Sequence, residues 1–125
     1  MKAIKKDQKL LQQSLEHEVF KTIAAFMNSE GGTLLVGIED DGTILGIERD
    51  FETFNDKKNW DGWLQHFTNL IREHIGIDVM IYLKPKMVKL NDNKIVGIIE
   101  VRKSSKPIYV EYKDTSGKNI VEFYI

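Results

Sequence analysis

The sequence contains no cysteine. Disulfide bonds, thiolate zinc sites and a cysteine nucleophile are therefore excluded together, and a cytoplasmic location is expected. No apolar run is long enough to span a membrane, and the N-terminal stretch MKAIKKDQKLLQQS lacks the features of a signal peptide. With 42% hydrophobic and 30% charged residues, the 125-residue chain is expected to form one soluble domain over residues 1–125, with no membrane partner.

The three histidines lack the spacing of a zinc site. His17, His66 and His74 fall in helical patterns, and no pair has the HExxH arrangement. His66 and His74 are two helical turns apart and could share a face, although solvent-facing histidines are commoner on helices. Neither a metal nor a cofactor is expected, apart from one acidic alternative described below.

The glycine-rich stretch AAFMNSEGGTLLVGIEDDGTILG covers residues 24–46. A phosphate-binding loop follows a strand and opens a helix, because its free N–H groups and the helix N-terminus point at the anion. Here Gly31 and Gly32 follow a helical pattern and precede an apolar strand pattern, and no Gly-Lys-Ser/Thr sequence follows. This order indicates a helix end and turns rather than an ATP-binding loop.

Hydrophobic periodicity predicts two helices, over residues 8–29 and 60–76. The remaining apolar runs have strand patterns, and a turn at DDG makes the second run the antiparallel partner of the first. These runs cover residues 33–38, 43–47, 78–85, 87–90, 94–102, 107–112 and 119–125. The predicted fold class is α+β, with two main helices packed on a mixed, largely antiparallel sheet of about five to six strands.

Trp60 and Trp63 form a pair at the start of the second helix. A tryptophan pair can serve as a base-stacking platform. Because these two continue the apolar stripe of the helix, we interpret them as core anchors.

An acidic cluster, Glu39 to Asp41, precedes Gly42. Hard oxygen ligands on a turn suit Mg²⁺ or Mn²⁺, which makes Asp40 and Asp41 the candidate metal ligands. Asp-Asp-Gly is also a tight-turn sequence, since Asp and Gly tolerate positive φ, and we prefer the turn.

Basic residues concentrate in the C-terminal third. Residues 31–83 hold four Lys/Arg against ten Asp/Glu, whereas residues 84–125 hold nine against five. A polyanion is therefore expected at this third, although lysines that protect strand edges would give the same pattern. The sequence SSKP at residues 104–107 follows a predicted strand, and its hydroxyls beside lysine favour phosphate binding or a turn over catalysis.

Two motifs carry a family resemblance. The first is a helix ending in Ala-Phe, Asn and Gly-Gly, then a strand, Asp-Asp-Gly and a glycine-containing return; the second is a valine strand followed by Ser, Lys and Pro. They are matched by Ala25, Phe26, Asn28, Gly31, Gly32, Gly37, Asp40, Asp41, Gly42 and Gly46, and by Val101, Ser105, Lys106 and Pro107. Jointly they resemble the Schlafen-like AlbA domain, a bacterial and archaeal family to which DNA binding is ascribed and which was once called a divergent AAA or ATP-binding region.

The chain departs from the family pattern at both ends. Members usually begin with a Glu-Phe-Lys strand and continue past the Phe-Tyr-Ile strand into a Gly-containing tail, whereas this chain begins MKAIKKDQK and stops at Ile125. We therefore expect a domain excised from a longer protein. In the Schlafen relatives that cut RNA, the resemblance implies a three-carboxylate metal site drawn partly from the Glu-Phe-Lys segment, so this chain is expected to be inactive as a nuclease.

These observations predict a non-enzymatic nucleic-acid-binding domain, with DNA favoured over RNA, at the N-terminus of a larger transcriptional regulator or helicase-related protein. The phosphate contacts are assigned to Arg102, Lys103, Ser104, Ser105, Lys106, Lys113 and Lys118. Structural roles are assigned to Asn28, Gly31, Gly32, Gly37, Gly42, Gly46 and Pro107. Two alternatives stay open: a metal-dependent nuclease half-site at residues 39–41, and a protein-interaction or homodimer module whose sheet edge pairs with a partner.

Overall fold

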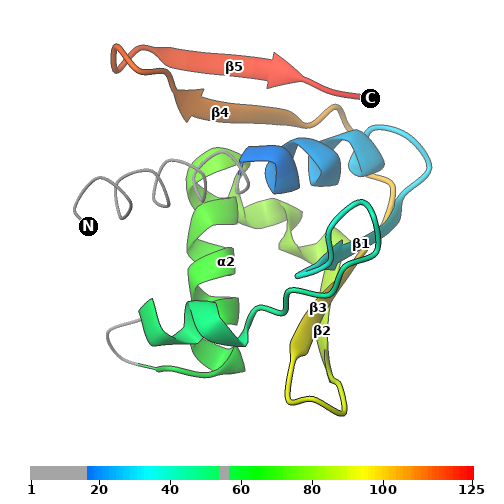
Figure 1. The fold of residues 1–125 in the computed structure, drawn as a ribbon. Coiled ribbons are helices and arrows are strands. Elements are labelled where there is room, and N and C mark those ends of the chain that lie inside the picture. Colours follow the sequence, from blue (N-terminus) through cyan, green and yellow to red (C-terminus); the bar gives the residue numbers. More distant parts are fainter. Residues whose placement is uncertain (1–16, 54–56) are drawn as a thin grey trace.

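The computed structural model describes residues 17–53 and 57–125. A helix covers residues 17–27, and α2 covers Trp60–His74 (Figure 1). The described strands are β1 (Gly32–Val36), β2 (Leu83–Lys89), β3 (Ile95–Val101), β4 (Tyr109–Lys113) and β5 (Asn119–Phe123), with 3-10 helices η1 (Glu48–Thr53) and η2 (Ile77–Tyr82). Both predicted helices are confirmed, although residues 8–16 of the first lie outside the described residues.

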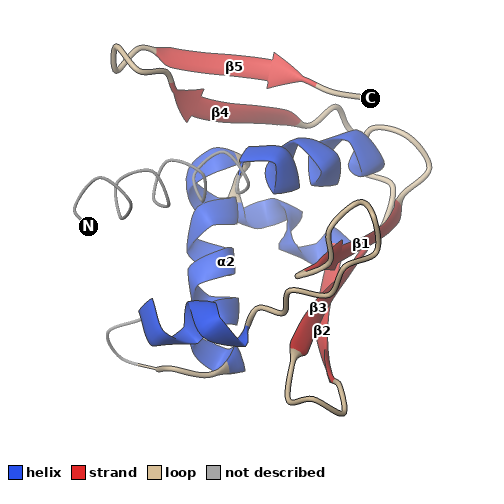
Figure 2. Cartoon of the chain, in the orientation of Figure 1, coloured by secondary structure: helices blue, strands red, loops and turns tan. Residues whose placement is uncertain are grey.

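The described strands form two antiparallel sheets (Figure 2). One has the order β1-β3-β2, and the other is the hairpin of β4 and β5. The predicted α+β class is confirmed, and the strands divide between two sheets because the chain leaves β3 and reaches the other side of the 17–27 helix before β4 begins (Figure 1). The hairpin therefore has no access to the edges of the first sheet.

Residues 43–47 do not form the predicted return strand. One isolated bridge between Ile38 and Ile44, together with hydrogen bonds from the Leu45 and Gly46 N–H groups to the Gly37 carbonyl, joins the two arms, and the regular ladder of β1 is with β3. The reason lies at Ile47, which is buried and whose N–H donates to the Ile95 carbonyl at 2.8 Å. Burying Ile47 draws the second arm away from β1 and into the core.

Residues 78–82, predicted as the first part of a strand, lie instead in η2. This turn of helix buries Val79 in the core cluster, and β2 then begins at Leu83. The last part of the predicted strand 78–85 and most of the predicted strand 87–90 thus belong to one strand, β2. Pro85 is tolerated because β2 is an edge strand, where a missing N–H costs no ladder hydrogen bond.

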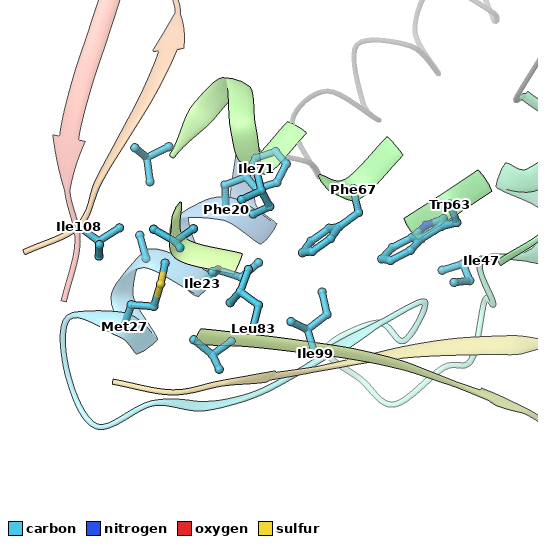
Figure 3. Close-up of a cluster of buried hydrophobic side chains, with 14 of the residues drawn as sticks. Phe20, Ile23, Met27, Ile47, Trp63, Phe67, Ile71, Leu83, Ile99 and Ile108 are labelled. Atoms are coloured by element: carbon cyan, nitrogen blue, oxygen red, sulfur yellow. The ribbon is translucent and has the colours of Figure 1, made fainter. Parts of the chain in front are cut away.

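The core lies between the three-stranded sheet and the two helices (Figure 3). Ile23 and Met27 enter it from the 17–27 helix, Ile71 from α2 and Ile99 from β3, and none of these four side chains has exposed surface. Burying apolar side chains of this size contributes about 1.5–3 kcal/mol each. The sheet and the helices therefore hold each other in place.

The two tryptophans belong to this core, as predicted. Trp63 is buried and stacks on Phe67 with 5.4 Å between ring centroids, while the partly buried Trp60 stacks on Trp63 at 4.9 Å. The ladder runs along one face of α2 and packs against the core, as expected for core anchors.

Asn28 attaches the β4–β5 hairpin to the end of the 17–27 helix. Its Nδ2 donates to the carbonyls of Ile108 and Tyr124, both at 2.8 Å, and its Oδ1 accepts from the Ile108 N–H at 2.8 Å. Ile108 and Val110 are buried beneath the hairpin, and His74 Nδ1 lies 2.8 Å from the Glu111 carbonyl. One amide side chain thus serves both strands of the hairpin.

Candidate nucleic-acid interface

The β3–β4 connection, residues 102–108, is anchored by backbone hydrogen bonds on both sides. The Arg102 N–H donates to the Tyr82 carbonyl at 2.9 Å, and the Ser104 N–H donates to the Met27 carbonyl at 2.8 Å. The Arg102 guanidinium also donates to the carbonyl of Ile81. The connection is therefore fixed between the η2–β2 junction and the 17–27 helix.

Gly31 lets the helix end approach this connection closely. It has a φ of +79°, and a Cβ on Gly31 would lie 2.6 Å from the Val101 carbonyl oxygen and 3.3 Å from the Lys103 nitrogen. Only glycine combines this left-handed conformation with such a short approach between backbones. The predicted structural role of Gly31 thus has a specific cause in the structure.

The two predicted serines have internal hydrogen-bond partners. Ser104 is buried, and its Oγ accepts from the Lys106 N–H at 3.2 Å. The Ser105 hydroxyl lies 3.2 Å from the Tyr82 hydroxyl, and this hydrogen bond is the main cause of a lowered pKa of the Tyr82 phenol. Both hydroxyls help to shape the connection.

The lysines of the connection are exposed and form surface ion pairs. Lys103 Nζ lies 3.9 Å from Glu30 Oε1, and Lys106 Nζ lies 3.1 Å from Asp78 Oδ2. Exposed pairs of this kind contribute about 0–1 kcal/mol, because water and salt screen them. A phosphate group can therefore replace either carboxylate at little cost.

Lys84 and Lys86, which are not among the predicted site residues, lie on β2 beside the end of β3 that leads into the connection. They alternate along β2 and stand opposite Glu100 and Ile98, on the face of the sheet away from buried Ile99. The hydrogen bond from Lys86 Nζ to Glu100, at 2.9 Å, is the main cause of a lowered pKa of that carboxyl. The alternating pattern KPK was the available signal, but splitting β2 into two predicted strands concealed the shared face.

The structure does not bring Lys113 and Lys118 to this cluster. Lys113 ends β4, and Lys118 lies in the turn that follows, at the end of the hairpin remote from the β3–β4 connection (Figure 1). Both are exposed. They form a separate basic group, and their predicted phosphate contact stays a prediction.

The Asp114 carboxylate holds the β4–β5 turn and gives it a defined acid sensitivity. Its Oδ1 accepts from the Ser116 hydroxyl at 2.6 Å and from the N–H groups of Ser116 and Lys118, and these bonds, led by the hydroxyl, lower the pKa of Asp114 below 3.8. Because the pKa is lowered in the folded state, the ionised carboxylate stabilises the turn at pH values above the ordinary aspartate pKa. This stabilisation is lost as the pH falls through the folded pKa. We expect the amide NMR shifts of Ser116 and Lys118 to titrate with a midpoint below 3.8, the ordinary value for aspartate. A midpoint above 3.8 would contradict this assignment.

The acidic cluster is arranged as a turn. The Gly42 N–H donates to the Glu39 carbonyl at 2.9 Å with a φ of +90°, and Asp41 Oδ1 accepts from the Thr43 N–H at 2.9 Å. This last hydrogen bond is the main cause of a lowered pKa of Asp41. In the part of the chain that the structure describes, no three His, Asp or Glu side chains are grouped so that they could hold a metal ion. Asp40 and Asp41 therefore lie in a turn and, among the described residues, are not part of a group of three side chains that could hold a metal ion.

The fold and the β3–β4 connection define an α+β domain with an exposed basic surface. A family model described as Schlafen, AlbA_2 matches residues 2–125, and the chain therefore belongs to this family of candidate DNA-binding modules. This confirms the resemblance read from the sequence. No solved structure matches the chain. Over the described residues, the longest helices are too short and too polar to cross a membrane.

Proposed function

We propose that this domain binds nucleic acid, with DNA favoured over RNA, through phosphate contacts at the η2–β2 junction and the β3–β4 connection. Family membership supports a nucleic-acid ligand. The observation that carries the proposal is that exposed cations from two distant parts of the chain lie on β2 and on the β3–β4 connection, which hydrogen bonds join at Tyr82. The group, called the Tyr82 cluster below, consists of Lys84, Lys86, Arg102, Lys103 and Lys106.

The chemistry of such a cluster is binding without catalysis. Lysine and arginine release condensed counterions when they neutralise phosphates, and these contacts carry no sequence information. Hydrogen bonds already order the backbone that carries Arg102 and Lys106. Less binding free energy is therefore lost in ordering this segment when the ligand binds. In a longer protein, this domain would act as the N-terminal nucleic-acid-binding module of a transcriptional regulator or helicase-related protein.

Replacing Lys103 and Lys106 together by Gln is expected to weaken DNA binding about tenfold at about 50 mM salt. Gln is preferred to Glu, because a carboxylate would face Glu30 and Asp78 and disturb the connection. Fluorescence anisotropy of labelled single-stranded and duplex DNA at about 50 and 200 mM salt measures the effect. The slope of log affinity against log salt should also fall, by about 0.7–0.9 for each lost phosphate contact.

The matched control is the double replacement of Lys113 and Lys118 by Gln, which removes the same charge at the remote end of the hairpin. This variant should lose clearly less affinity than the Lys103 and Lys106 variant, because the proposed contacts lie at the other end of the hairpin. An equal loss in both variants would show that net charge alone is responsible, and no binding of either DNA at low salt would refute the proposed function.

A further inference from the structure

Two aromatic side chains are exposed on the outer face of the β4–β5 hairpin. Tyr109 is 52% exposed and Phe123 is 45% exposed, and they stand directly opposite each other in the strand register. Their ring centroids are 5.4 Å apart, with the planes tilted by 48°. The alternate residues of β4, such as Val110, supply the buried face, so the core does not require these two rings to be aromatic.

Further apolar surface lies beside the two rings on the outer face of the hairpin. Val121, also on the outer face, is 60% exposed, and Glu111 opposite it is the one acid that faces outward between the ends of the described β4–β5 ladder. Tyr109 and Phe123 occupy the end of the hairpin at which the β3–β4 connection arrives (Figure 1). The cation nearest in sequence is Lys106, three residues before Tyr109.

The sheet face that carries Lys84 and Lys86 has a different composition. Its outward residues on β1 and β3 include Leu35 and Ile98, and no aromatic residue stands on the described strands of that face. Tyr82, the ring beside these cations, packs partly buried against the core and its hydroxyl is bonded to Ser105. Both rings of the hairpin pair are about half exposed, so they offer the more open surface for stacking.

We propose that Tyr109 and Phe123 form a stacking platform for unpaired bases, so that the ligand is single-stranded nucleic acid. This inference rests on the proposed phosphate binding at the Tyr82 cluster. Bases in a duplex are already stacked and present only their edges, whereas each base of a single strand has a free π-face. A strand whose phosphates contact Lys106 and its neighbours can place its next bases on the two rings.

The deciding variant replaces both Tyr109 and Phe123 by Leu, which keeps apolar surface but removes the rings. Two labelled probes of about 12 nucleotides are compared, an oligothymidine and an abasic strand with the same number of phosphates, a length within the range that single-strand-binding domains cover. The unaltered protein should bind oligothymidine more tightly than the abasic strand. The Leu variant should lose about tenfold or more of its oligothymidine affinity, while its abasic affinity and its salt slope stay unchanged.

The control is the exchange of Tyr109 for Phe and Phe123 for Tyr, which retains both rings and should retain the preference for bases. Thermal unfolding of both variants checks that the hairpin stays intact. This check separates base stacking from a purely structural role of the cross-strand pair. Unchanged oligothymidine affinity in the Leu variant, or equal binding of the two probes by the unaltered protein, would overturn the platform and leave phosphate binding standing. The platform would also be overturned if the Leu variant binds oligothymidine as before but has a different molecular mass in solution. That result would identify the two rings as a protein-docking face. No binding of either probe would refute phosphate binding itself and the platform with it.

Discussion

Replacing Asn28 by Asp is expected to lower the free energy of unfolding by about 3 kcal/mol or more, although the two side chains have nearly the same shape. The Asn28 Nδ2 donates to the carbonyls of Ile108 and Tyr124. A carboxylate oxygen in its place would face two carbonyl oxygens with no proton to share. Each carbonyl left without a donor costs about 1–3 kcal/mol, and the partly buried charge adds to this.

Urea denaturation at neutral pH, followed by tryptophan fluorescence, measures the change. Asn119→Asp is the matched control, because Asn119 is exposed on β5 and its change is expected to stay within about 0.5 kcal/mol. At a pH low enough to protonate the carboxylate introduced by Asn28→Asp, the difference in stability between the variant and the unaltered protein at the same pH should shrink, since a protonated carboxyl offers one donor. A loss at neutral pH no larger than that of the control would show that the amide does not hold the hairpin.

Replacing Gly31 by Ala is expected to lower the free energy of unfolding by about 2–4 kcal/mol. A left-handed backbone costs an L-residue about 1–2 kcal/mol. The added Cβ would also lie 2.6 Å from the Val101 carbonyl oxygen, and neither backbone can move without shifting β3 or the end of the 17–27 helix. The same shift would move Arg102 and Lys103, so nucleic-acid affinity should fall along with stability.

Gly42→Ala separates the two causes. Gly42 has a similar φ of +90°, but its added Cβ would meet nothing within 4 Å. This control carries only the cost of the backbone conformation, about 1–2 kcal/mol, and should leave nucleic-acid affinity unchanged. Equal losses of stability in the two variants, measured by the same urea denaturation, would mean that the close approach at Val101 is relieved without cost.

Features that depend on neighbours in the chain could be read from the sequence. The helix over residues 60–76, the turn at Asp41 and Gly42 and the order of helix, glycines and strand around Gly31 all appear in the structure close to where they were predicted. Hydrophobic periodicity and positive-φ preference act within a few residues, so their signals survive in the sequence alone. The family could likewise be recognised from the sequence, because its motifs are short and have set spacings.

Features that depend on distant contacts could not be read in this way. Residues 43–47 do not extend the sheet beside β1, because Ile47 is buried in the core and its N–H is bonded to the Ile95 carbonyl. Strand register and the path of the connection past the helix decide which residues form the Tyr82 cluster. They also separate Lys113 and Lys118 from it and leave Tyr109 exposed beside Phe123. The sequence by itself thus determined the elements, the turns and the family, whereas only the tertiary structure decided which cations and rings share a surface, since packing selects among pairings that local preferences leave equal.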